Sequence, residues 1–149
     1  MRTVIQRCQY CEVEVNDELV GNINSGLLIF LGIGKEDSRE DADYLIDKIV
    51  NLRIFEDENQ KMNLSALDLN KELMLVSQFT LFGDCRQGRR PSFFEAAPPA
   101  EAEKLYDYFV EKAKKSRLKI ETGEFQAMMD ISLVNDGPVT ILVDSKKKF

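Results

Sequence analysis

The sequence predicts a single α+β domain. Two segments carry the periodicity of amphipathic helices, several shorter apolar segments have the length of β-strands, and no linker, repeat or low-complexity stretch divides the 149 residues. A chain of this length suits one domain of ordinary size, which we place at residues 1–149. Hydrophobic residues make up 44% of the chain, enough for a substantial core.

The first half of the chain should form strands followed by a helix. We expect strands over residues 3–15, 19–23 and 27–33, with a turn at Asn16-Asp17. Ser38 is a favourable N-cap for a helix over residues 39–52. The apolar residues of this helix follow the i, i+3, i+4 spacing of one buried face. They are Ala42, Leu45, Ile46, Ile49 and Val50.

The second half should contain further strands and a second helix. We expect a short strand and polar turn over residues 53–63, strands over 72–82, 127–134 and 139–143, and a Gly/Arg-rich loop over 83–91. A helix should occupy residues 100–116, with Ala102, Leu105, Tyr106, Phe109, Val110 and Ala113 facing inward. The strand over 127–134 has apolar residues on both faces, so it lies either inside the domain or at a subunit interface.

The composition excludes several kinds of chemistry. The chain has no histidine, which removes the Ser-His-Asp and Cys-His schemes and the usual proton shuttle near neutral pH. An enzyme of this composition must use backbone dipoles, hydroxyls, carboxylates or its substrate. No apolar run approaches the roughly 20 residues of a membrane span and no secretory signal is evident, so we expect a cytoplasmic protein.

Cys8 and Cys11 form a C-x-x-C motif that is typical of redox sites or of half a zinc site. A zinc site needs about four ligands, and the chain offers no second pair. Residues three apart in a strand also point to opposite faces. With Cys85 the cysteine count is odd, so we expect no disulfide framework, no metal and no cofactor.

The net charge of −6 argues against general nucleic-acid affinity but permits a local basic patch. The ordinary interpretation of each basic cluster is a solvated surface, and we favour it for the lysines at the C-terminus. The clusters are Arg86, Arg89 and Arg90 in one loop, Lys112, Lys114, Lys115, Arg117 and Lys119 near a helix end, and Lys146 to Lys148.

Two short segments break local sequence rules, which often marks function. Ser77-Gln78-Phe79-Thr80 ends an apolar strand, and strand parity places Gln78 and Thr80 on one face. These polar side chains would be costly to bury without partners. The ordinary interpretation is that the strand ends here and its polar groups reach solvent. The second segment, Asn135 to Thr140, looks like a plain turn. However, its Gly137-Pro138 bond can be cis at an intrinsic cost of about 0.5–1 kcal/mol, which could aim both carbonyl oxygens the same way.

These two segments resemble the signature motifs of the D-aminoacyl-tRNA deacylase family. They stand in the right order, at a similar spacing and in a chain of similar length. Further similar stretches span nearly the whole chain. They are Ile5-Gln6-Arg7, Tyr44 to Phe55, Lys61-Met62-Asn63, Arg90-Pro91-Ser92-Phe93 and Leu105 to Phe109.

The resemblance implies a homodimer with a β-barrel-like α+β fold, an antiparallel or mixed sheet, two helices and active sites at the subunit interface. Ser77, Gln78, Phe79 and Thr80 would line the pocket, with the Phe79 N–H near the scissile ester. Gly137 and Pro138 would be joined by a cis bond and would enter the partner's pocket, held in place by Arg7.

The implied activity is hydrolysis of the ester in D-aminoacyl-tRNA, a carboxylic ester hydrolase reaction that releases free D-amino acid and tRNA. L-aminoacyl groups would be rejected by collision with the Gly137 and Pro138 carbonyls, which gives chiral proofreading in translation. Glycine, including glycine mischarged on tRNA-Ala, would be accepted. Backbone donors can stabilise the tetrahedral oxyanion, and the substrate's 2′-hydroxyl would assist water. Without a neighbouring base, Thr80 is a poor nucleophile, so we expect it to position the substrate.

The three loop arginines, Arg86, Arg89 and Arg90, are candidates for contacts with acceptor-stem phosphates. We expect a tRNA partner and no membrane or DNA partner. A rival interpretation is a non-enzymatic tRNA-binding module, which would need exposed stacking aromatics in a basic groove. Many aromatic residues here are expected to be buried. Other rivals are a structural dimer whose Gly-Pro is only a turn and a deacylase specialised for another small aminoacyl group.

Overall fold

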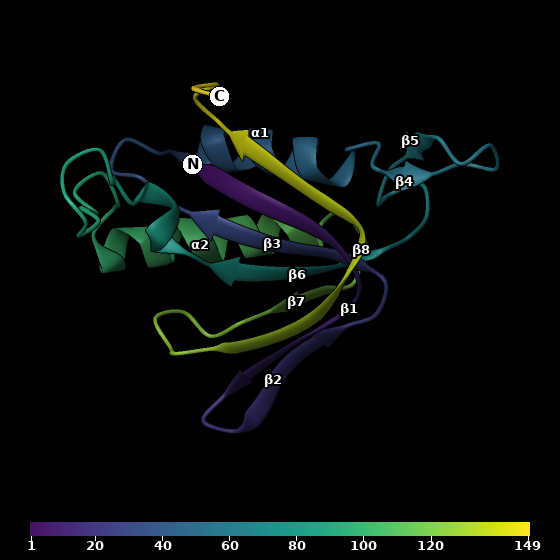
Figure 1. Ribbon diagram of the computed structural model, residues 1–149, viewed down its shortest axis with the longest axis horizontal. Coiled ribbons are helices and arrows are strands. Elements are labelled where there is room, and N and C mark those ends of the chain that lie inside the picture. The colour runs from purple at the N-terminus through teal and green to yellow at the C-terminus, as the bar shows by residue number, and fades with distance from the viewer.

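A strongly curved six-stranded sheet carries both helices on one face (Figure 1). The computed structural model describes residues 1–149 and confirms the α+β class. The sheet strands are β1 (Arg2–Val15), β2 (Glu18–Ile23), β3 (Gly26–Gly32), β6 (Glu72–Ser77), β7 (Ile120–Thr122) and β8 (Asp130–Asp144). The other elements are the helices α1 (Arg39–Val50) and α2 (Pro99–Lys114), the 3-10 helix η1 (Phe79–Phe82), and a hairpin of β4 (Phe55–Glu56) and β5 (Met62–Leu64).

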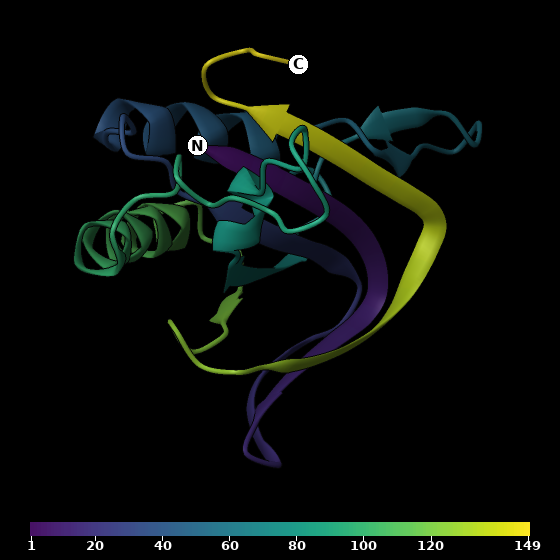
Figure 2. The same ribbon diagram turned by 60° about the vertical axis from the view of Figure 1, so that its left-hand side comes forward.

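The sheet is mixed, and its longest strands close it into a barrel-like shape. The order is β2-β1-β3-β6-β7, and β8 also pairs with β1. Strand β1 is antiparallel to β2, β3 and β8, whereas β3–β6 and β6–β7 are parallel pairs. Both β1 and β8 bend sharply near their middles, so one half of each lies near the helices and the other half curls away (Figure 2).

Both faces of the sheet are covered by apolar side chains. Leu27, Ile29 and Leu31 of β3 pack into the larger core beneath α1 and α2. Leu28, their neighbour on the same strand, belongs to a smaller core enclosed by the curled half of the sheet. A strand buried on both faces has no polar alternation, which explains the continuous apolar run of β3.

Both predicted helices are confirmed. The five apolar positions of α1 are all buried, and the Asp41 carboxylate accepts a hydrogen bond from the Ser38 N–H at 2.9 Å, which fixes the start of the helix. Helix α2 is tied to the sheet by Tyr106, whose buried hydroxyl donates to the Leu75 carbonyl at 2.9 Å. Tyr108 on the same helix donates to Asp43 of α1, also at 2.9 Å.

The strand expected over residues 72–82 is shorter than predicted. It ends at Ser77, and the next residues form the tight turn of η1. The turn packs across Gly32, where an added Cβ would lie 3.0 Å from both the Gln78 carbonyl oxygen and Leu81 Cβ. Strand parity therefore does not apply to Thr80, which is helical, but the Gln78 and Thr80 side chains do lie together and are joined by a hydrogen bond.

Strand β8 differs from the prediction in one respect and agrees in another. The expected break at residues 135–138 is an irregularity within one continuous strand, where the register against β1 shifts between Gln6 and Cys8. On one face of the 127–134 segment, Met129, Ile131 and Leu133 pack on the smaller core. The short strand β7 was not predicted.

The expectation that Cys8 and Cys11 face opposite sides is wrong. A second register shift between Cys8 and Tyr10 changes the parity of β1, and both thiols are fully buried in the smaller core. Burial raises the pKa of both thiols, that of Cys11 to about 12. Cys85 is exposed.

None of the helices combines the length and apolar character that a membrane crossing requires.

We expect Tyr106→Phe to lower the free energy of unfolding by about 1 kcal/mol, the usual net value of a neutral hydrogen bond. The Leu75 carbonyl keeps a second bond, from the Gly123 N–H at 3.0 Å, so the loss should be no larger. Urea denaturation at one protein concentration measures it. Tyr10→Phe is the control, because Tyr10 is exposed and its hydroxyl makes no hydrogen bond. Equal stability of the two variants would contradict this role.

We expect iodoacetamide at pH 8 to alkylate Cys85 alone in the folded protein, because Cys8 and Cys11 are buried and their pKa values are raised. Mass spectrometry should show one modified thiol per folded chain and all three after unfolding in urea. Modification of Cys8 or Cys11 without unfolding would show that the smaller core opens.

Candidate functional site

The segment Ser77 to Thr80 lies where β6 turns into η1. The Gln78 N–H donates to the Leu31 carbonyl at 2.8 Å, which fixes the turn to the end of β3. The Gln78 side-chain amide donates to the Thr80 hydroxyl. Ser77 and Gln78 are half-buried, whereas Phe79 and Thr80 are exposed. The segment therefore presents an amide, two hydroxyls and the first backbone N–H groups of a helix at an open surface.

The environment of Thr80 argues against a nucleophilic role. The side-chain hydrogen bond of its hydroxyl is with the Gln78 amide, which has no basicity near neutral pH. No carboxylate or amine lies within hydrogen-bonding distance of the hydroxyl. The arrangement suits binding and orientation of a polar substrate.

The Gly137-Pro138 bond is cis, and both residues are exposed on β8. Gly137 has a φ of +116°, a conformation that side chains strongly disfavour. An added Cβ would lie 2.8 Å from Val139 Cγ2 and 3.0 Å from the Arg7 guanidinium. Glycine is therefore required here both by backbone conformation and by space.

Arg7 holds this segment from the neighbouring strand. Its side chain is buried, and its Nε lies 3.0 Å from the Asp136 carboxylate and 3.2 Å from the Asp136 carbonyl oxygen. A second guanidinium nitrogen donates to the Ile54 carbonyl at 2.6 Å, and the third lies 3.8 Å from Glu56. Asp136 and Glu56 are partners that the sequence analysis missed, because no local pattern links either residue to Arg7.

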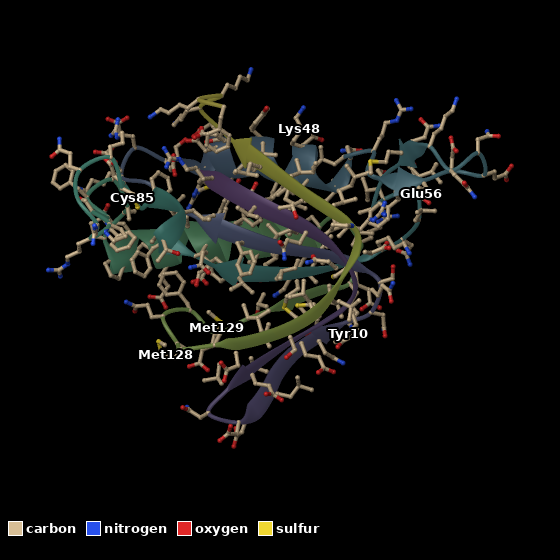
Figure 3. All side chains as sticks on the ribbon, viewed as in Figure 1. Tyr10, Lys48, Glu56, Cys85, Met128 and Met129 are labelled. Atoms are coloured by element: carbon tan, nitrogen blue, oxygen red, sulfur yellow. The ribbon has the colours of Figure 1, made fainter.

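The two motifs do not meet within one chain. Arg7 pairs with Leu27 across β1 and β3, whereas Ser77 pairs with Leu31, four residues further along β3. Four residues of strand span roughly 13 Å. In Figure 3, Glu56, which lies 3.8 Å from the Arg7 guanidinium, and Cys85, in the loop after η1, are at opposite ends of the molecule.

The loop after η1 carries the three candidate arginines. Two backbone hydrogen bonds between Asp84 and Ser92, at 2.7 and 3.0 Å, close it. Arg86 forms a bidentate ion pair with Asp84, in which Nε donates to Oδ1 at 2.9 Å and Nη2 donates to Oδ2 at 2.7 Å. This pair lowers the pKa of the Asp84 carboxyl. Arg89 and Arg90 are exposed and form no ion pair. These two arginines are free to contact an anion.

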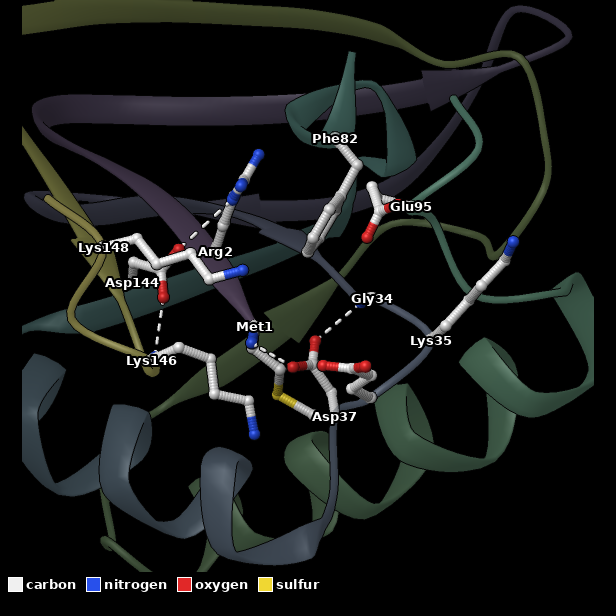
Figure 4. Close-up of a pocket in the computed structure, with 11 residues that line it drawn as sticks. Met1, Arg2, Gly34, Lys35, Asp37, Phe82, Glu95, Asp144, Lys146 and Lys148 are labelled. Carbon is white, nitrogen blue, oxygen red and sulfur yellow. Dashed lines mark hydrogen bonds and ion pairs between the residues drawn. The ribbon is translucent and has the colours of Figure 1, made fainter. Parts of the chain in front are cut away.

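A small pocket lies next to η1 and is lined in part by Phe82 (Figure 4). Some of its charged groups are already paired: Arg2 lies 3.2 Å from Asp144, and Asp37 lies 2.6 Å from the N-terminal ammonium. The volume of about 30 Å³ has room for about one water. This pocket is too small to hold an aminoacyl group.

Comparisons with known proteins point to one family. The family model described as D-Tyr-tRNA(Tyr) deacylase matches residues 4–144. A D-aminoacyl-tRNA deacylase of Thermosipho africanus is 63% identical over 149 residues, and one of Clostridioides difficile is 56% identical over 149 residues. Both matches cover the whole of each chain.

Solved structures show the same fold. One described as c-Myc DNA Unwinding Element Binding Protein is 38% identical, with a TM-score of 0.91 over 97% of this chain and 98% of the other. A probable eukaryotic D-amino acid tRNA deacylase is 16% identical, with a TM-score of 0.84 over 95% and 97% of the two chains, and it supports the fold alone. The family model and the full-length relatives together show that this chain belongs to the D-aminoacyl-tRNA deacylase family.

Proposed function

We propose that this chain hydrolyses the ester between a D-amino acid and the terminal ribose of tRNA, and so serves chiral proofreading in the cytoplasm. The observation that carries the proposal is the exposed turn at Ser77–Thr80, where backbone N–H groups and polar side chains lie together without a histidine. The names of the full-length relatives support the same substrate.

The chemistry follows from the groups that this turn offers. Ester hydrolysis passes through a tetrahedral oxyanion, and backbone N–H groups stabilise such an anion without changing protonation. The Phe79 N–H, at the start of η1, is the donor in this proposal, and Gln78 and Thr80 orient the substrate. The 2′-hydroxyl of the ribose assists the attack of water. The proposed partner is therefore RNA, since DNA lacks this hydroxyl.

Chirality is read by a second copy of the chain. Gly137 and Pro138 are exposed and lie at the other end of the sheet from Ser77 in the same chain, so in this proposal a neighbouring molecule brings them to the turn. Their carbonyl oxygens would face the α-carbon of the aminoacyl group and collide with an L side chain. A D side chain points away from them, and glycine has none to reject.

A homodimer has a suitable surface on β8. This strand pairs with β1 alone, so its outer edge is open for most of its length. Exposed apolar side chains lie along or beside the strand, among them Met128, Val134 and Leu142. The sequence allowed the 127–134 strand to lie either inside the domain or at a subunit interface. The exposure of these side chains in the single chain supports a subunit interface.

The proposed function is tested with D-tyrosyl-, L-tyrosyl- and glycyl-tRNA incubated separately with the purified protein, following ester loss over time. We expect hydrolysis of the D-tyrosyl and glycyl esters at rates that exceed that of the L-tyrosyl ester on the order of 100-fold. Equal rates on D and L esters would leave only a general esterase. No hydrolysis of any ester would favour the binding-module alternative. Hydrolysis of glycyl-tRNA alone would favour a deacylase specialised for a small aminoacyl group.

Gly137→Ala should lower the ratio of the D-tyrosyl to the L-tyrosyl rate by about tenfold, because the new Cβ displaces either Val139 or Arg7 and shifts the carbonyls that collide with the L side chain. Gly88→Ala is a control for stability only. Because nothing lies within 4 Å of the added Cβ, urea denaturation of this variant measures the loss of stability caused by a side chain at positive φ alone. A folded Gly137→Ala variant with the rate and selectivity of wild type would refute the role of this segment.

The salt dependence of the reaction tests the arginine loop. Replacing Arg89 and Arg90 together by alanine should reduce the slope of log(kcat/KM) against log[salt] by about 1.5, the loss of two phosphate contacts. Arg117→Ala is the control, because Arg117 is exposed, forms no ion pair and follows the far end of α2, about 24 Å along the helix. An unchanged slope in the double variant would remove the loop from the tRNA interface.

A further inference from the structure

Three phenylalanines beside the Ser77–Thr80 turn are exposed. They are Phe79, Phe93 and Phe94, with exposed fractions of 59%, 36% and 73%, and together we call them the aromatic platform. This exposure was not predicted, in contrast to the burial of Tyr106 and Phe109, which was expected and is observed. Phe79 and Phe93 are in ring contact and Phe94 follows Phe93 in the chain, and such a group of exposed aromatic residues usually marks a binding surface.

The platform is built on fixed backbone. The Phe79 and Phe93 rings pack edge to face, with centroids 5.0 Å apart. The Lys35 ammonium lies 3.4 Å from the centre of the Phe94 ring, and the Lys35 N–H donates to the Glu95 carbonyl at 3.1 Å. The paired backbone of Asp84 and Ser92 holds the other side. The rings are therefore held in place without being buried.

The charges around the platform identify its occupant. Arg89 and Arg90 lie in the loop that leads into Phe93, and neither is neutralised by a carboxylate. Aromatic faces that stack on bases, flanked by cations that meet phosphates, are the combination that binds single-stranded nucleic acid. An apolar protein partner would not account for the free arginines.

We propose that the aromatic platform binds the unpaired nucleotides that precede the aminoacylated 3′-terminal adenosine of tRNA, an inference that rests on the proposed function. Phe79 links the two sites, because its backbone N–H belongs to the hydrolytic turn while its ring belongs to the platform. A strand whose terminal ester reaches this N–H passes next to the ring. Phe94, the most exposed of the three, takes a base on the ring face that Lys35 does not cover.

The test compares Phe94→Leu, which keeps apolar bulk but removes the aromatic face, with Phe94→Tyr, which keeps the ring. Each variant is assayed on D-tyrosyl-tRNA and on D-tyrosyl-adenosine, which lacks the preceding nucleotides. We expect Phe94→Leu to lose about tenfold in kcat/KM on the tRNA ester and to match wild type on the adenosine ester. Phe94→Tyr should match wild type on both.

Affinity for uncharged tRNA is measured in parallel, and it should weaken about tenfold in Phe94→Leu alone. If wild type hydrolyses neither ester but this loss of affinity remains, the platform stands and the proposed function fails. Unchanged affinity, or equal loss on both esters, overturns the platform. Dissociation of Phe94→Leu into monomers by light scattering also overturns it, since a second copy would then cover the rings. Leu19→Ala, exposed on β2, is the matched control.

Discussion

The arrangement of β8 and the β4–β5 hairpin depends on the hydrogen bonds and ion pairs of the buried Arg7 guanidinium. Burying a charge costs several kcal/mol unless its partners are well placed, and here they come from two separate places in the sequence. Asp136 supplies a carboxylate and a carbonyl from β8, Ile54 a carbonyl and Glu56 a more distant carboxylate. Because satisfying this charge fixes all of these partners at once, the exposed Gly137-Pro138 segment is held rigidly although nothing covers it.

The rest of the fold serves to hold a short turn open at the far end of the same sheet. Parallel pairing of β3 with β6, with apolar cores on both faces, brings the chain to Ser77 in a fixed direction. Gly32 then leaves the space in which η1 turns. What emerges at the surface is polar but holds no strongly basic or acidic group. Such a surface is suited to bind and orient an ester whose own ribose supplies a reactive hydroxyl, and selectivity then depends on shape.

Much of this fold follows from local patterns, and the exceptions have physical causes. The spacing of Leu45, Ile46 and Ile49 defines α1, because one face of a helix repeats within a few residues. The motifs at Ser77 and Gly137 stand out because polar and turn residues interrupt apolar strands. In contrast, β7 is only three residues long and pairs with a distant strand, the Arg7 partners are scattered in sequence, and the exposure of Phe94 depends on tertiary packing. The facing of Cys8 and Cys11 was misjudged because a strand irregularity resets parity.

The separation of the two motifs along the sheet has a genetic consequence under the proposed arrangement. In this arrangement, each catalytic centre is assembled from the turn of one chain and the Gly137-Pro138 segment of another. A mutation in the Gly137-Pro138 segment of one chain therefore impairs the centre that contains its partner's turn. A chain defective at Thr80 and a chain defective at Gly137 can then complement each other, because their mixed dimer retains one intact pairing. By the same count, an excess of chains with a single defect would not lower the activity per healthy chain, because each healthy chain still completes one intact centre with its defective partner, so either defect alone would be recessive.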